Sequence, residues 1–97
     1  MEKPNQKQID AWKAQFGEIS QINVGDKSCI LRKPNRKEMS FAAASAATDP
    51  LKYNEVILKA CWLAGDMEIQ TNDDLFLSIS PKLSELIELK EAELVKL

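Results

Sequence analysis

Four cationic side chains lie within one short stretch of the sequence, the basic cluster Arg32, Lys33, Arg36 and Lys37. Such a cluster can bind phosphates through a few salt-sensitive contacts, or it can contact an acidic protein surface. A nucleic-acid reader usually adds a polar recognition helix or stacking aromatics, and the alanine-rich stretch that follows offers no such face. The interpretation we favour is that these charges lie at the end of a strand and keep the edge of a sheet soluble.

Residues that could support catalysis or metal binding are sparse. The chain has no histidine, which removes the commonest general base and the commonest metal ligand. Its three glycines are scattered, so no glycine-rich phosphate loop can form. Asp73 and Asp74 could face a magnesium ion, but neighbouring acids are routine at a helix N-terminus. We therefore expect no enzyme activity, no cofactor and no metal site.

Length and composition indicate one folded domain. The chain has 97 residues, of which 44% are hydrophobic and 29% charged. The net charge of −2 gives no overall attraction to nucleic acid or to an anionic membrane. Residues 1–48 hold eight Lys/Arg against five Asp/Glu, whereas residues 49–97 hold five against ten. This asymmetry could steer a partner or align two copies head to tail.

The two cysteines and the apolar runs indicate the compartment. Cys29 and Cys61 are far apart and lack a metal-binding spacing, which is typical of buried reduced thiols in an intracellular protein. The first ten residues contain no apolar signal core. The longest near-apolar run, Phe41 to Ala47, is far shorter than the ~20 residues of a membrane span. We expect a cytoplasmic protein that makes no membrane contact.

The first element is a helix that begins at an Asn5 cap and ends at Gly17. Ile9, Trp12 and Phe16 recur at helical spacing and form one narrow apolar stripe. The helix could lie on the body of the protein or form an arm that orders in an assembly. Trp12 is accordingly open to two interpretations, local packing or contact with a partner.

A β-hairpin follows, with Gly25 and Asp26 as a two-residue type II′ turn. An isolated hairpin is marginally stable in water. It therefore needs a helix beneath it or a neighbouring strand beside it. The turn sets a register that pairs Ser20 with Leu31, Ile22 with Cys29 and Val24 with Lys27.

The helical part begins after Pro34. Asn35 and Glu38 have the spacing of a capping box, so a helix starts there. The alanines at 42–47 favour a tightly packed inner helix, with Met39 and the alanines facing inward.

Two more helix starts follow in the sequence. Asp49 caps a strongly apolar helix, our candidate for the central one, with Trp62 in the core and a stop at Gly65. Ser80 followed by Pro81 repeats the cap-and-proline start and predicts a last amphipathic helix to the end of the sequence.

These elements predict a single α+β domain over residues 1–97 that is mainly helical. It has an N-terminal helix or arm over 1–17 and one N-terminal-half β-hairpin over 18–34. Three or four packed helices follow over 35–97.

Several stretches together carry a family resemblance. They are the strand leading into LRKPNRKEM (31–39), the alanine-rich helix, DPLKYNEVILKACWLAGD (49–66) and the acidic loop with Asp73 and Asp74. In these features residues 18–95 resemble the small tail assembly chaperones of long-tailed bacteriophages. The helix that carries Trp12 is not part of the pattern.

The resemblance implies a non-enzymatic role in the cytoplasm of a bacterial host. Members of the family bind the long, hydrophobic tape measure protein, keep it soluble and help to recruit tail tube subunits. They are often made in two lengths through a programmed frameshift, and self-association around the tape measure belongs to the same picture.

Apolar grooves near Met39, Phe41, Leu75 and Phe76 could then cover an amphipathic helix of the tape measure protein, the client of such a chaperone. Each of these four residues is equally compatible with a plain core position. The competing hypothesis is a prophage-encoded adaptor or structural module without chaperone activity. A small DNA-binding regulator that uses the basic cluster ranks below both.

Overall fold

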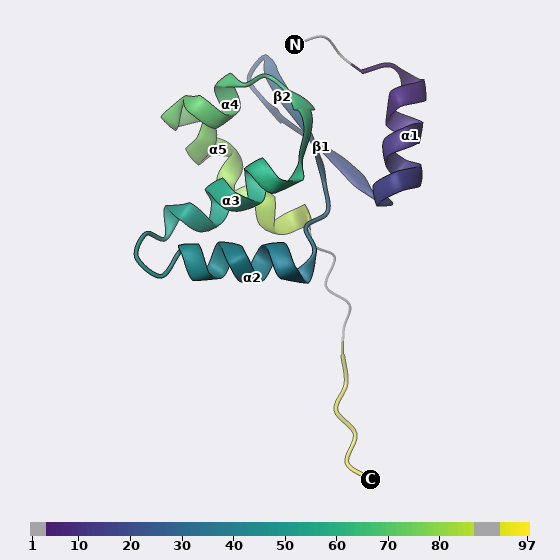
Figure 1. Ribbon diagram of the computed structural model, residues 1–97, viewed down its shortest axis with the longest axis vertical. Coiled ribbons are helices and arrows are strands. Elements are labelled where there is room, and N and C mark those ends of the chain that lie inside the picture. Colours follow the sequence, from purple (N-terminus) through teal and green to yellow (C-terminus); the bar gives the residue numbers. More distant parts are fainter. Residues whose placement is uncertain (1–3, 87–91) are drawn as a thin grey trace.

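The computed structural model describes residues 4–86 and 92–97 (Figure 1). It confirms the α+β class, with a β-hairpin in the N-terminal half and a mainly helical remainder. The elements in chain order are α1 (Gln6–Phe16), β1 (Ile19–Val24), β2 (Lys27–Arg32), α2 (Arg36–Ser45), α3 (Leu51–Cys61), β3 (Trp62–Gly65), α4 (Glu68–Thr71), α5 (Asp73–Leu83) and the 3-10 turn η1 (Ser84–Leu86).

The hairpin has the predicted register. Antiparallel β1 and β2 pair Ser20 with Leu31, Ile22 with Cys29 and Val24 with Lys27. Gly25 has a φ of 60°, and no described non-glycine residue has a positive φ, as a type II′ turn requires. The local turn chemistry therefore determined the pairing of these two strands.

A third strand, β3, was not predicted. The sequence favoured one helix from Asp49 to Gly65, but α3 ends at Cys61 and residues 62–65 pair antiparallel with β2. The pairing continues one residue further, where Asp66 donates its N–H to the Ser28 carbonyl at 3.0 Å and accepts the Ser28 N–H on its carboxylate at 2.9 Å. Strand pairing with β2 satisfies the hairpin's need for a neighbour, and it outweighs the local helix propensity.

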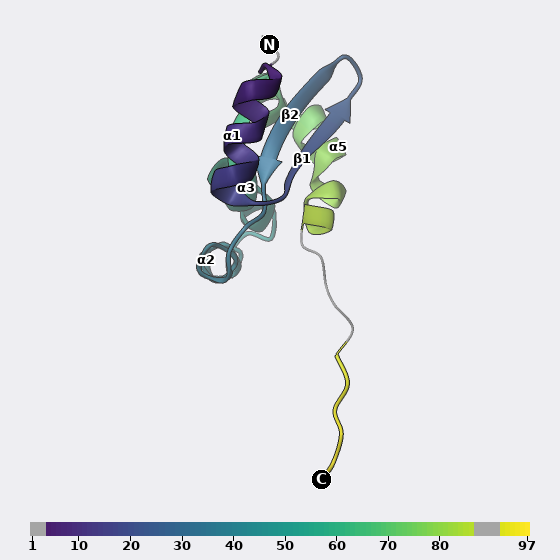
Figure 2. The same ribbon diagram turned by 90° about the vertical axis from the view of Figure 1, so that its right-hand side faces the viewer.

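The sheet lies between α1 on one face and α3, α4 and α5 on the other (Figures 1 and 2). Cys29 and Leu31 of β2 face the helical side and are fully buried with Leu58 and Cys61 of α3. Both cysteines are free and buried, as expected. Ile30 is also buried, but it alternates to the face where α1 lies. The main core is thus between the sheet and the helices that follow it.

Helix α2 is an outer helix, which corrects the prediction of a tightly packed inner one. Its only buried residue is Ala42, while Met39 is half-buried and Phe41 is 65% exposed. Figure 1 shows α2 along the outside of α3. Alanine side chains give a helix good intrinsic propensity, but they supply too little apolar area to draw it into the core.

The helix start predicted at Ser80 is wrong, whereas Asp73 and Asp74 do lie in the first turn of a helix, as expected. Helix α5 begins after Asn72, whose side chain accepts the Leu75 N–H at 3.1 Å, and it continues through Pro81 to Leu83. Ser80 caps nothing, because its hydroxyl donates to the Phe76 carbonyl at 2.8 Å. Residues 92–97 have no regular secondary structure, and the part of the predicted helix at 87–91 lies outside the described residues.

We predict that Gly65→Ala destabilises the fold by about 2 kcal/mol or more, since a Cβ at this position overpacks the core. The added atom would lie 2.6 Å from the Cβ of Cys29 and 2.8 Å from Cζ2 of Trp62. Urea unfolding measures the change. Ala43→Ser on the exposed side of α2 is the control, with an expected change within about 0.5 kcal/mol. Equal effects of the two substitutions would contradict the close packing of β3 on β2.

Candidate functional site

Arg32 belongs to an internal ion pair and not to a surface patch. Its Nη1 donates to Oε1 of Glu38 at 2.8 Å, and its Nη2 donates to Oε2 of Glu38 and to the Ala60 carbonyl at 2.7 Å. Both side chains of the pair are only 20% exposed. The other three members of the basic cluster remain exposed: Lys33, Arg36 and Lys37.

The Glu38 carboxylate serves two structural purposes. It accepts the Asn35 N–H at 3.0 Å while Asn35 accepts the Glu38 N–H at 2.8 Å, which confirms the predicted capping box. The hydrogen bonds from Arg32 lower the pKa of Glu38, and those to Glu38 raise the pKa of Arg32. The Arg32 guanidinium also lies 5.7 Å from the centre of the Phe16 ring at the end of α1. Arg32 therefore joins α1, β2, α2 and α3.

An apolar groove of about 390 Å³ opens between α2, α3 and α5. We name it the Met39 groove. Met39 contributes from α2, Tyr53 and Ile57 from α3, and Pro81 and Leu83 from α5. The remaining lining residues are Pro34, Asn54, Ser80 and Ser84. Long apolar side chains with a few polar groups at the margin suit an apolar helix better than a polar small molecule.

The other predicted site residues lie elsewhere. Phe41 follows Met39 by two residues, so it projects from nearly the opposite side of α2, next to exposed Arg36 and Lys37. Phe76 lines a separate hollow with Leu77, and its neighbour Leu75 is half-buried.

Trp12 is half-buried on α1, which packs against the sheet and has no fully buried residue. The structure thus does not bring the predicted apolar residues into one site. Of these residues, only Met39 lines the Met39 groove.

Sequence reasoning missed most of this groove. Tyr53 carried no distinctive signal, and Pro81 was interpreted as a helix start although it lies inside α5. The spacing of Arg32 and Glu38, across Pro34, could have indicated that α2 folds back onto the strand end. That spacing alone does not place α5, which completes the groove.

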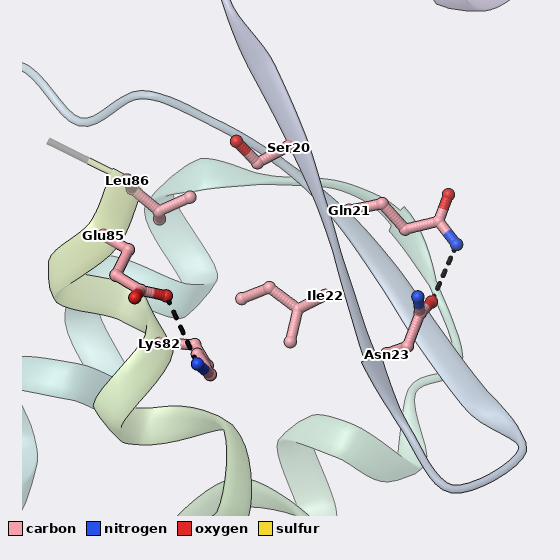
Figure 3. Close-up of a pocket in the computed structure, with 7 residues that line it drawn as sticks. All are labelled: Ser20, Gln21, Ile22, Asn23, Lys82, Glu85 and Leu86. Carbon is pink, nitrogen blue, oxygen red and sulfur yellow. Dashed lines mark hydrogen bonds and ion pairs between the residues drawn. The ribbon is translucent and has the colours of Figure 1, made fainter. Parts of the chain in front are cut away.

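A third hollow lies beside the edge strand β1 and has a volume of about 350 Å³ (Figure 3). We name it the β1 groove. Figure 3 shows Ile22 pointing from β1 into the space in front of α5 and η1. At its rim Lys82 and Glu85 form an ion pair at 3.6 Å, while on the other side of β1 the Gln21 side chain donates to Asn23 at 2.8 Å (Figure 3).

The described residues contain no arrangement typical of a catalytic metal centre. Over residues 4–86 and 92–97, no group of three His, Cys, Asp or Glu side chains could hold a metal ion. No helix within the same ranges has the length and apolar character needed to cross a bilayer. Comparison of the chain with protein-family models, with curated proteins and with solved structures found no match.

We predict that Arg32→Met costs about 2 kcal/mol of unfolding free energy, because it leaves the Glu38 carboxylate partly buried without its main partner. Lys37→Met lies on the exposed side of α2, the helix that carries Glu38, and should change the free energy of unfolding by less than about 0.5 kcal/mol. Urea unfolding at pH 7 measures both. A basic cluster that acts only at the surface would give two similar small effects.

The ion pair also predicts a dependence on pH. The pKa of Glu38 is lower in the folded chain, so its contribution is complete above the ordinary glutamate pKa of about 4.3 and is lost as the pH falls through the folded value. Glu38→Gln should therefore be less stable than the native chain at pH 7, and this difference should shrink between about pH 5 and pH 3. Urea midpoints across that range provide the measurement. A difference that stays constant with pH would contradict the role of the charged carboxylate.

Proposed function

We propose that this chain is a non-enzymatic assembly chaperone that holds an amphipathic helix of a hydrophobic client in the Met39 groove. The observation that carries the proposal is the groove itself, an apolar hollow of about 390 Å³ bounded by three helices. A client helix would present apolar side chains at i, i+3, i+4 and i+7 to such a surface. Covering those side chains keeps a client soluble without any chemical step.

The resemblance to phage tail assembly chaperones suggests the client. Two of the stretches that carry it, residues 31–39 and 49–66, supply Pro34, Met39, Tyr53 and Ile57 to the groove. We propose that the client is a tape measure protein, whose long hydrophobic helices need cover before the tail forms. Recruitment of tail tube subunits in the cytoplasm of a bacterial host would follow from the same role.

A second candidate function uses the exposed face of α2. Phe41 is 65% exposed and lies beside Arg36 and Lys37, a combination that fits an acidic protein surface. In this alternative the chain is an adaptor without chaperone activity. The basic cluster supports DNA binding less well, since Arg32 is held by Glu38 and Ala60.

Co-expression with a tape measure fragment tests the proposal. We expect the native chain to keep the fragment in the soluble fraction and Met39→Asp to lose this effect, because the substitution places a charge in the groove. Phe41→Asp, on the opposite side of the same helix, is the matched control and should act like the native chain.

Thermal melts followed by circular dichroism show whether each variant folds. Asn54→Trp tests the groove a second time. Its bulk fills the groove without adding a charge, so it should lose the solubilising effect as Met39→Asp does. A fragment that stays equally insoluble with or without the native chain would overturn the proposal. Loss of solubility through Phe41→Asp alone would place the client on the outer face of α2 and overturn the Met39 groove as its site.

A further inference from the structure

The sheet has an open edge at β1. The strand order is β1-β2-β3, so β1 pairs on one side with β2 and has no described strand on its other side. Backbone N–H and C=O groups along such an edge can accept an added strand. The β1 groove runs along this edge, with Ser20 to Asn23 on the strand side and with Lys82, Glu85 and Leu86 on the helical side (Figure 3).

An apolar segment of the same chain lies uncovered. Residues 92–97 have no regular secondary structure and run away from the folded body (Figures 1 and 2). Leu94 is 90% exposed, Val95 is 64% exposed and Leu97 is fully exposed. No hydrogen bond joins this segment to the described remainder of the chain. It is therefore an extended arm whose apolar side chains and backbone groups have no cover.

We propose that residues 92–97 of one copy add a strand to β1 of a second copy. In an extended strand, alternate residues share one face. Glu93, Val95 and Leu97 would face the β1 groove, while Leu94 would face the side of the sheet where α1 lies.

The chemistry of the two surfaces matches in this orientation. Ile22 and Leu86 offer apolar contacts to Val95 and Leu97. Lys82, 63% exposed at the rim and paired with Glu85 at 3.6 Å, would lie between that carboxylate and Glu93. Backbone pairing supplies affinity, and the alternating side chains set the register.

A second copy suits this arm better than its own groove, because the arm leaves the body and points away from β1 (Figure 1). Reciprocal exchange between two copies would bury two such strands around one twofold axis. The β1 groove shares no lining residue with the Met39 groove. The inference therefore goes beyond the proposed function and does not rest on it.

Disulfide trapping between single variants of the full chain tests the arrangement. Gln21→Cys and Leu94→Cys would lie on the same face of the extended sheet, and we expect a mixed disulfide dimer when the two variants are combined under mild oxidation. Burial raises the pKa of both native thiols, Cys29 and Cys61, to about 11, which keeps them from competing. Met67→Cys, 57% exposed on another part of the surface, is the control partner for Leu94→Cys.

The proposal would be overturned if Leu94→Cys formed its mixed disulfide with Gln21→Cys no faster than with Met67→Cys. A double Gln21→Cys, Leu94→Cys variant that closes its disulfide within a single chain would also overturn it, since the arm would then occupy its own groove.

Sedimentation equilibrium of the native chain gives an independent readout. We expect a concentration-dependent dimer whose dissociation constant rises at least about 10-fold in Val95→Asp, because a charge then faces the apolar side chains Ile22 and Leu86. Met67→Asp should leave the constant unchanged. A native chain that stays monomeric up to millimolar concentration would overturn the exchange. Both experiments omit any client, so their failure is distinguishable from failure of the chaperone proposal.

Discussion

The ion pair between Arg32 and Glu38 joins four elements of the fold at the edge of its apolar core. One guanidinium binds both oxygens of the carboxylate and the Ala60 carbonyl, and it also contacts the Phe16 ring. A planar guanidinium can do this because its donors are fixed in a fork, which lysine lacks. The contacts fix the end of β2, the first turn of α2 and the last turn of α3. The Ala60 carbonyl that accepts from Arg32 lies one residue before the end of α3, and the chain then pairs with β2 as β3.

The Met39 groove follows from this arrangement. Glu38 anchors the first turn of α2, and the next residue, Met39, faces α3 and α5. Phe41 is left on the outer side of the same helix. The groove walls are therefore set by a charged junction outside the groove, and its lining can stay apolar. Such a division suits the helix-binding role that we propose.

The sequence predicted well those features whose partners lie within a few residues. The Asn5 cap, the Asn35–Glu38 capping box and the turn at Gly25 are all confirmed, since each depends on local backbone geometry. Features that depend on distant partners were missed. Residues 62–65 have local helix propensity but form a strand through pairing with β2. The contact of Arg32 with the Ala60 carbonyl spans 28 residues and left no signal in the sequence, whereas its pairing with Glu38, six residues away, was overlooked.

A methionine-methyl NMR titration tests the central claim most directly. Met39 lies in the groove and Met67 lies 57% exposed outside it, so two resonances of one sample report on binding and on its control. The titrant is a helical peptide from a tape measure protein. We predict that the Met39 methyl resonance shifts with saturation while that of Met67 stays in place. A saturating shift at Met67 alone, or no shift at either methyl, would contradict helix binding in the Met39 groove.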